Sequence, residues 1–285
     1  MKNEKKKSLV IYELNEIPKK VLENYITKNP KSNLAKICKK QGYAETVTFD
    51  LGELHPWSSW PTFHRGVNSE IHKIKFLNQD IKNAEKFPPI WKTLHDKGFS
   101  IGIFGSLQSY PPLKGENVKF YLPDTFAPYP DTYPIYLEDF QNFNLALTMR
   151  NKAHARAIEY GDIRRFLGLI LSGMFTLKTL YKLFKHVFLE LINKKYKTRR
   201  SLLQPVLGFD IYYKLLKKHK PQFSTFFSNH VAGVMHRYWK DTFPEDFKKN
   251  KNNKNNRDSF NENSLNLALE IADSQIGFLL DFQNN

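Results

Sequence analysis

The sequence predicts an α/β fold: a mostly parallel sheet flanked by helices, with an inserted helical subdomain. Apolar stretches rich in β-branched residues, SLVIYEL (8–14) and FSIGIFGS (99–106), are typical of buried strands. Between them, PKKVLENYITKN (18–29) and PPIWKTLHDKG (88–98) have the spacing of helices. Strands and helices in alternation indicate parallel strands joined by crossover helices. The 285 residues suffice for one large domain or two small ones.

The other elements of the N-terminal part follow from capping and turn residues. SNLAKICKKQG (32–42) predicts a helix that begins after Ser32 or Asn33 and stops at Gly42. AETVTFD (44–50) predicts a strand, and VKFYLPD (118–124) predicts another. HPWSSWPTFHRG (55–66), between them, is dense in aromatic and polar residues and is expected to form a loop.

From Ala153 to about Lys197 the pattern is nearly continuously helical, with a wide apolar face and interspersed lysines. This region is either a buried helical hairpin or a surface that lies on a membrane or docks on a partner. A transmembrane span is not expected, because lysines recur every few residues. Further on, 209–221 predicts a helix, 222–233 a strand running into a loop, and 264–282 an amphipathic helix.

Three regions follow from this pattern. Residues 1–150 form the N-terminal part of the α/β core, 151–220 the helical insertion, and 221–285 the continuation of the core. Within the last region, DFKKNKNNKNNRDSFNEN is a polar, low-complexity segment.

Composition and charge narrow the function classes. The formal net charge is +16, but many lysines lie in Lys/Asn-rich runs, so a nucleic-acid partner is not expected. An anionic membrane surface or an anionic ester substrate remains as a partner. Cys38 is the sole cysteine, which excludes an internal disulfide and a cysteine-based zinc site. No signal sequence is evident, so we expect a cytoplasmic protein, with peripheral membrane attachment as an option.

Polar clusters follow three of the expected strands, at 13–16, 55–66 and 228–239. Open parallel sheets bind ligands at the carboxyl ends of their strands. The three clusters are therefore the candidate site, and their residues and spacing resemble those of a known family.

The chain resembles the alkaline phosphatase superfamily, in particular its nucleotide pyrophosphatase/phosphodiesterase and sulfatase-like branch. The family's hydroxyl–aromatic–Pro loop is similar to Ser59-Trp60-Pro61-Thr62, and its later Trp-bearing helix and strand are similar to 90–106. The resemblance also includes Gly66, His72-Lys73-Ile74 and FFSNHVAGVMHRYW (226–239). It covers about 8–106 and 222–282 and leaves the helical insertion outside.

The resemblance implies an alkaline-phosphatase-like fold and a phosphodiesterase- or sulfatase-like hydrolase or phosphotransferase. A hydroxyl nucleophile would lie between two divalent cations about 4 Å apart and form a covalent intermediate. Ser59 is the implied nucleophile, with Ser58 as its rival. Thr62 stands where the family often binds a non-bridging oxygen, and the planar fork of Arg65 suits an anionic oxygen.

The implied metal ligands are Asn15, Asn229 and His236, and the implied metal is zinc or manganese. Asn stands where the family has Asp at two of these positions, and an amide oxygen brings no charge and suits zinc poorly. Glu13 and Glu16 flank Asn15 and are alternative ligands, and His230 is an alternative imidazole ligand to His236.

The family's last ligands follow its final helix, in a strand ending Ser-Asp-His-Gly, whereas this sequence stops at LLDFQNN. We therefore expect a C-terminally truncated family member. Three hypotheses follow: a fragment of a complete enzyme; a divergent branch with weak or no metal; and a non-catalytic protein that binds an anion, a membrane or a partner through its basic helical insertion.

Structural roles compete with functional ones at several residues. His55, His64 and His72 are irregularly spaced for a metal cluster, and His72 is expected to hydrogen-bond loop backbone. Asp124 is expected to cap the turn after it. The tryptophans are expected to pack, and for Trp60, beside Ser59, substrate contact is open in addition to packing. For His236 a functional and a structural role are both open.

Overall fold

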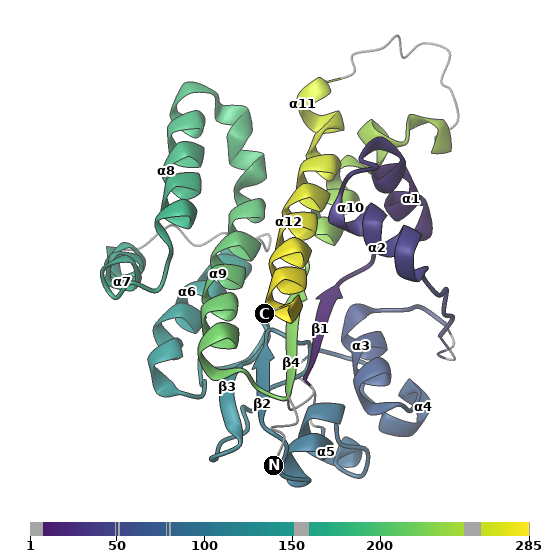
Figure 1. Ribbon diagram of the computed structural model, residues 1–285, viewed down its shortest axis with the longest axis vertical. Helices are drawn as coiled ribbons and strands as arrows, with labels where there is room; N and C mark the ends of the chain where they lie inside the picture. Colours follow the sequence, from purple (N-terminus) through teal and green to yellow (C-terminus); the bar gives the residue numbers. More distant parts are fainter. Residues whose placement is uncertain are drawn as a thin grey trace. The chain divides into compact units, whose positions relative to one another are not determined.

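A computed structural model describes residues 8–48, 50, 52–77, 79, 81–150, 160–247 and 258–284 (Figure 1). The chain forms two compact units, and each is assembled from three separate stretches. Unit 1 comprises 1–13, 46–176 and 210–227, and unit 2 comprises 14–45, 177–209 and 228–285. The units are therefore interleaved along the sequence.

Unit 1 contains the sheet. Its strands are β1 (Leu9–Leu14), β2 (Ile101–Phe104), β3 (Val118–Leu122) and β4 (Phe223–Ser228), although Leu14 and Ser228 group with unit 2. Its helices are α3 (Pro56–Arg65), α4 (Ser69–His72), η1 (Lys82–Ala84), α5 (Ile90–Asp96), η2 (Ile135–Leu137), α6 (Glu138–Arg150), α7 (Tyr160–Leu171) and the 210–219 part of α9 (Leu203–His219).

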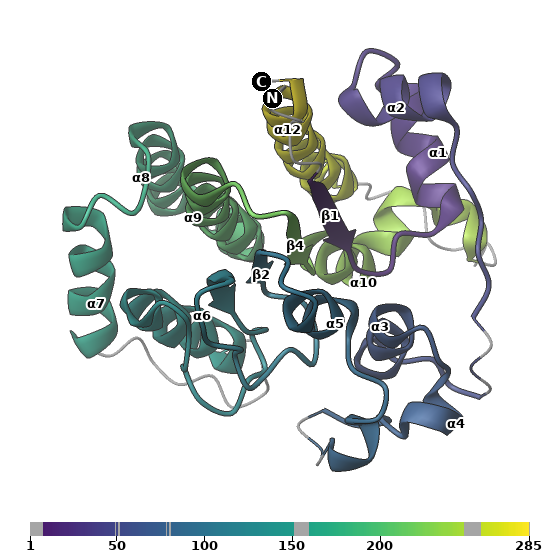
Figure 2. The same ribbon diagram turned by 60° about the horizontal axis from the view of Figure 1, so that its bottom comes forward.

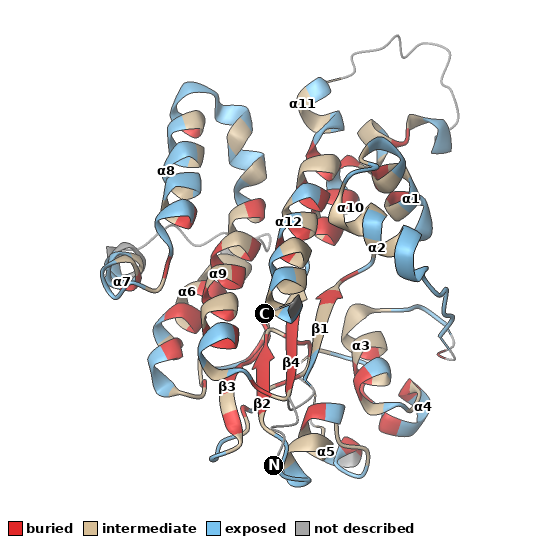
Figure 3. Ribbon diagram, viewed as in Figure 1, coloured by how far each residue is buried: buried red, intermediate tan, exposed pale blue. Residues whose placement is uncertain are grey.

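The four strands are parallel and lie in the order β1-β4-β2-β3, which confirms the predicted α/β class with helices flanking the sheet. Strands β2, β3 and β4 are almost wholly buried (Figure 3). This burial explains why their sequences are apolar runs without polar alternation. Between Ile101 and Gly102 the register against β3 shifts by one residue.

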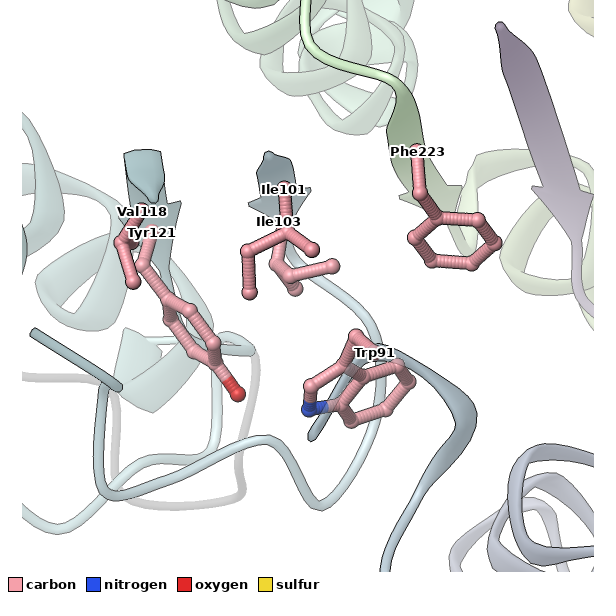
Figure 4. Packing of buried hydrophobic residues seen from close by; sticks show 6 residues of the cluster. All are labelled: Trp91, Ile101, Ile103, Val118, Tyr121 and Phe223. Carbon is pink, nitrogen blue, oxygen red and sulfur yellow. The ribbon is translucent and has the colours of Figure 1, made fainter. Parts of the chain in front are cut away.

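One face of the sheet packs against α5 (Figure 2). Trp91 of α5 is 2% exposed and lies among side chains of β2, β3 and β4. Figure 4 shows this cluster, which consists of Trp91, Ile101, Ile103, Val118, Tyr121 and Phe223. Large aromatic rings supply much of the buried area here, as the sequence predicted for Trp91.

The opposite face packs against the second half of α9. The ring of Tyr212 lies 4.9 Å from that of Phe226 and 5.8 Å from that of Phe104. Its hydroxyl group lies 3.1 Å from Ser224 Oγ, so the phenol has a polar partner inside the core. Gly102 leaves room on this face, because a Cβ there would stand 2.4 Å from the ring of Phe120.

Unit 2 is helical. Its elements are α1 (Lys19–Lys28), α2 (Asn33–Gln41), α8 (Leu177–Ile192), η3 (Lys194–Leu202), α10 (His230–Thr242), η4 (Pro244–Asp246), α11 (Ser259–Glu262), α12 (Ser264–Asn284) and the 203–209 part of α9. The cap predicted for α2 is confirmed: Ser32 Oγ accepts from the Ala35 N–H group, and Gly42 ends the helix. The Asp273 carboxylate on α12 accepts from the Leu34 N–H group at 2.7 Å.

The prediction of a loop at 55–66 is wrong, because residues 56–65 form helix α3. Pro56 occupies the first helical turn, where its missing N–H group is not needed. Pro61 lies inside the helix and cannot donate to the carbonyl of Trp57. Gly66, in the left-handed region at φ 68°, ends it.

Two further predictions were wrong. The described residues of 44–50 are not in a strand, and Val47 is 88% exposed. β-propensity needs a packing partner, and this segment pairs with none of the described strands. At 222–233, strand β4 is confirmed, but His230 begins helix α10 where a loop was expected.

The predicted helical insertion, 151–220, contains α7, α8, η3 and α9, with residues 151–159 outside the described part. The buried-hairpin interpretation is wrong for α8, because Leu177 is 85% and Leu191 80% exposed. Figure 3 shows this exposure along α8. Among the described helices, none is long and apolar enough to cross a membrane.

Candidate functional site

In unit 1, helix α3 is fixed beside the carboxyl ends of the parallel strands. Glu13, near the end of β1, contacts His64 Nε2 at 2.8 Å through one carboxylate oxygen. Its other oxygen accepts from Ser106, just after β2, at 2.8 Å. Ser106 Oγ in turn lies 2.7 Å from Thr225 Oγ1 of β4. This buried network ties α3 to three strands.

His64 is enclosed by aromatic rings. Its ring centroid lies 4.7 Å from Trp91 and 5.6 Å from Trp60, and its side chain is 2% exposed. Trp60 also packs edge-on against Phe227 of β4 at 5.4 Å. The Nδ1 atom of His64 is buried and has no hydrogen-bond partner among the described residues. His64 therefore anchors α3 through its Nε2 atom and its ring.

The two serines of the predicted site differ in their environment. Ser58 is buried, and its hydroxyl donates to the carbonyl of His55 at 3.0 Å. Ser59 is half-buried, and its hydroxyl has no hydrogen-bond partner in the part of the chain that the structure describes. Of the two hydroxyls, that of Ser59 is the one available to a ligand.

Thr62, one turn after Ser59, belongs to a hydrogen-bond chain. Its Oγ1 atom lies 2.8 Å from Asp50 Oδ2 and 2.9 Å from His72 Nε2. The His72 Nδ1 atom accepts from the Ile74 N–H group at 2.9 Å, so Nε2 carries the proton of the neutral ring. The order of donation is then His72 to Thr62 to Asp50. The predicted backbone contact of His72 is confirmed.

The surroundings of this hydrogen-bond chain favour a neutral His72 and an ionised Asp50. Burial, followed by the nearby charge of Arg65, lowers the pKa of His72, and Asp50 only partly offsets this. Burial alone would raise the pKa of Asp50. Hydrogen bonds from the Ser69 N–H group and the Thr62 hydroxyl outweigh that effect, and the pKa of Asp50 lies below its ordinary value.

Arg65 ends α3, and its guanidinium reaches the backbone between residues 84 and 87. Its Nη1 atom donates to the carbonyl of Ala84 at 2.9 Å and to that of Phe87. Its Nε and Nη2 atoms have no partner among the described residues. Burial lowers the pKa of Arg65, yet an arginine stays charged at any physiological pH.

In unit 2, two asparagines that were predicted as metal ligands contact each other. The Asn15 Nδ2 group donates to Asn229 Oδ1 at 2.8 Å. The backbone supports the pair, because the Asn15 N–H group donates to the Ser228 carbonyl at 3.1 Å. Asn15 and Asn229 follow β1 and β4 directly, so adjacent parallel strands bring them together.

His236, the third predicted ligand, contacts Glu16. His236 Nε2 lies 2.6 Å from Glu16 Oε2, and Glu16 Oε1 accepts from Asn15 at 3.2 Å. Glu16 has a left-handed backbone at φ 52°, which is uncommon for a residue with a side chain.

The side chains of Asn15 and Asn229 are poor ligands for a divalent transition metal. Asn15 and Asn229 are neutral and use an amide donor and an amide oxygen on each other. The described residues contain no group of three or more His, Cys, Asp or Glu side chains that could hold a metal ion. We therefore derive no chemical step through a metal.

The polar network in unit 1 was not predicted. Glu13 was expected only as a metal ligand, and Ser106, Thr225 and Asp50 were not among the candidate residues. Their position could have indicated a role for Glu13 and Ser106, which are polar residues at the ends of apolar strands. The predicted cap at Asp124 is confirmed, because its Oδ1 atom accepts from the Phe126 N–H group at 2.8 Å.

Comparison with known proteins gives no relative to guide the interpretation of this site. No protein-family model, no curated protein and no solved structure matches the chain.

Proposed function

We propose that the protein is a hydrolase or phosphotransferase of anionic esters, phosphodiester or sulfate, with Ser59 as its nucleophile. The observation that carries the proposal is the unpartnered hydroxyl of Ser59 on a helix anchored beside the carboxyl ends of parallel strands. Ligands of open α/β sheets bind at these ends. The sequence resemblance singles out the same serine.

The chemistry takes two steps. In the first, Ser59 Oγ forms a bond to phosphorus or sulfur and loses its proton, while the ester oxygen leaves and gains a proton. In the second, water breaks the bond between Ser59 and the transferred group and regenerates the hydroxyl. A phosphotransferase would use an acceptor alcohol in place of that water.

In this proposal, Arg65 contacts the anionic group of the substrate. Its Nε and Nη2 donors are not used by the described residues, and a guanidinium suits two oxygens of a phosphate or sulfate. Thr62 has one hydroxyl proton, and Asp50 accepts it at 2.8 Å. While that bond holds, Thr62 cannot donate to an ester oxygen, so its role is to position α3 against Asp50 and His72.

The test compares wild type with Ser59→Ala and the matched control Ser58→Ala. The substrates are bis(p-nitrophenyl) phosphate and p-nitrophenyl sulfate, each assayed with chelator, with zinc and with manganese. Loss of the nucleophile lowers kcat/KM at least about a hundredfold. Ser58→Ala keeps activity close to wild type, because its hydroxyl only bonds the His55 carbonyl.

Two outcomes would reject this function. One is the absence of turnover by folded wild-type protein under all three metal conditions. The other is turnover that Ser59→Ala leaves unchanged, since a reaction that survives without this hydroxyl does not use it.

A second candidate is a protein of the same descent that binds the anionic ester without cleaving it. It is favoured by the neutral Asn15–Asn229 pair, which supplies no negative charge for a metal. Calorimetric titration with a non-hydrolysable phosphodiester analogue separates the two. Binding that Arg65→Ala weakens, without turnover by wild type, supports this candidate.

A further inference from the structure

One face of helix α8 exposes a continuous line of large apolar side chains. Its members, here called the α8 stripe, are Leu177, Tyr181, Phe184, Phe188 and Leu191. They recur at intervals of four and three residues, which places them on one side of an α-helix. Each is between 61% and 85% exposed.

The other side of α8 accounts for the helix's own packing. Thr179 and Glu190 are buried, and α8 packs against η3 within unit 2. The α8 stripe is therefore not needed to hold the helix in place. Contiguous exposed apolar patches of several hundred Å² are often functional, which makes the α8 stripe a candidate interaction site.

Positive charge flanks the stripe. Lys178, Lys182 and Lys185 each follow a stripe residue by one position, so they line one edge of it. Residues 177–202 contain eight lysines and arginines and a single acid, Glu190. That acid is buried, and its carboxylate accepts from Arg200 Nε at 2.7 Å, so it presents no negative charge beside the stripe.

We propose that α8 lies in the surface of an anionic lipid membrane, with the α8 stripe in the acyl boundary and the lysines at the headgroups. An apolar face edged by lysines is the arrangement by which amphipathic helices bind such surfaces. A second copy of the chain fits less well, because an antiparallel two-fold contact through this face would place the lysine-lined edges of the two copies side by side, where they repel. The inference does not depend on the proposed hydrolase activity.

Vesicle co-sedimentation tests the proposal with full-length protein. Phe184→Glu places a charge on the α8 stripe and lowers the partition coefficient on phosphatidylserine-containing vesicles at least about tenfold. Its control is Phe76→Glu, since Phe76 is 69% exposed in unit 1, outside α8. Circular dichroism confirms that both variants are folded.

The lysine edge is tested separately. Lys185→Glu weakens binding about fivefold or more, because each basic residue near an anionic surface contributes about 1 kcal/mol. The control is Lys36→Glu, an exposed lysine of α2. Added salt weakens wild-type binding, and vesicles of phosphatidylcholine alone bind it less.

Three results would overturn the inference. They are wild-type binding that Phe184→Glu leaves unchanged, equal binding to neutral and anionic vesicles, and a wild-type dimer in sedimentation velocity that Phe184→Glu converts to monomer. The last result would assign the α8 stripe to self-association.

Discussion

The buried carboxylate of Glu13 offers the sharpest test of how α3 is held in unit 1. Its side chain is 0% exposed, and its two oxygens contact His64 and Ser106, each at 2.8 Å. Glu13→Ala removes both contacts at once. Glu13→Gln keeps the shape, with one amide atom able to accept from His64 and the other able to donate to Ser106.

The expected loss of stability follows from the buried polar groups that Glu13→Ala leaves without a partner. A buried polar group that loses its partner costs about 1–3 kcal/mol. His64 has no partner at Nδ1 among the described residues, so after Glu13→Ala neither ring nitrogen is paired, whereas Ser106 keeps Thr225. With the cavity left by the missing side chain, we expect a loss of about 4 kcal/mol from the free energy of unfolding. Glu13→Gln should cost about 1 kcal/mol.

Urea unfolding followed by tryptophan fluorescence measures this difference. Trp57, Trp60 and Trp91 lie in unit 1 and only Trp239 in unit 2, so the signal reports mainly on unit 1. The midpoint should fall far more for Glu13→Ala than for Glu13→Gln. Equal midpoints for the two variants would refute the reasoning, because the network would then contribute nothing beyond side-chain volume.

Two further predictions concern packing and pH. Gly102→Ala should destabilise the protein by about 1–3 kcal/mol, since the new Cβ meets the ring of Phe120, whereas Gly233→Ala, with open space in α10, should stabilise it by about 0.5–1 kcal/mol. Thermal unfolding decides this, and equal shifts for both variants would contradict it. Burial lowers the pKa of His230 from 6.5 to about 4, so the unfolded chain binds a proton there before the folded one does. The free energy of unfolding should therefore fall by about 3 kcal/mol as pH drops from 6.5 to about 4. Urea unfolding at a series of pH values should show a smaller fall for His230→Phe.

The fold could be predicted where local sequence decides the structure. Strands β1 to β4 were all found, because strands buried in a parallel sheet are apolar runs. Helix α3 was missed because its dense mixture of aromatic and polar residues was interpreted as a loop. Tertiary contacts such as that of His64 with Glu13 stabilise this helix despite Pro61 inside it. The false strand at 44–50 has strand-like composition but no partner strand among those described.

The site was harder to predict, because its contacts join distant positions. Glu13 and His64 are separated by 51 positions, and no spacing rule connects them. The partners of Arg65 are backbone carbonyls, and such contacts cannot be predicted from the pattern of side chains in the sequence. The apolar face of α8 was visible in the sequence, but whether another element covers it depends on tertiary packing.

The interleaving of the two units has a consequence for synthesis on the ribosome. In the described sheet β1 lies at an edge beside β4 alone, and residues 15–222 separate the two strands. Leu9–Leu14 therefore emerges long before the strand that it pairs with has been translated. Throughout that interval its backbone groups lack their native partner, and unpaired strand edges of this kind are prone to wrong association. Unit 1 cannot finish folding until residues 210–227 have been made, and unit 2 cannot do so until residues 228–285 have been made.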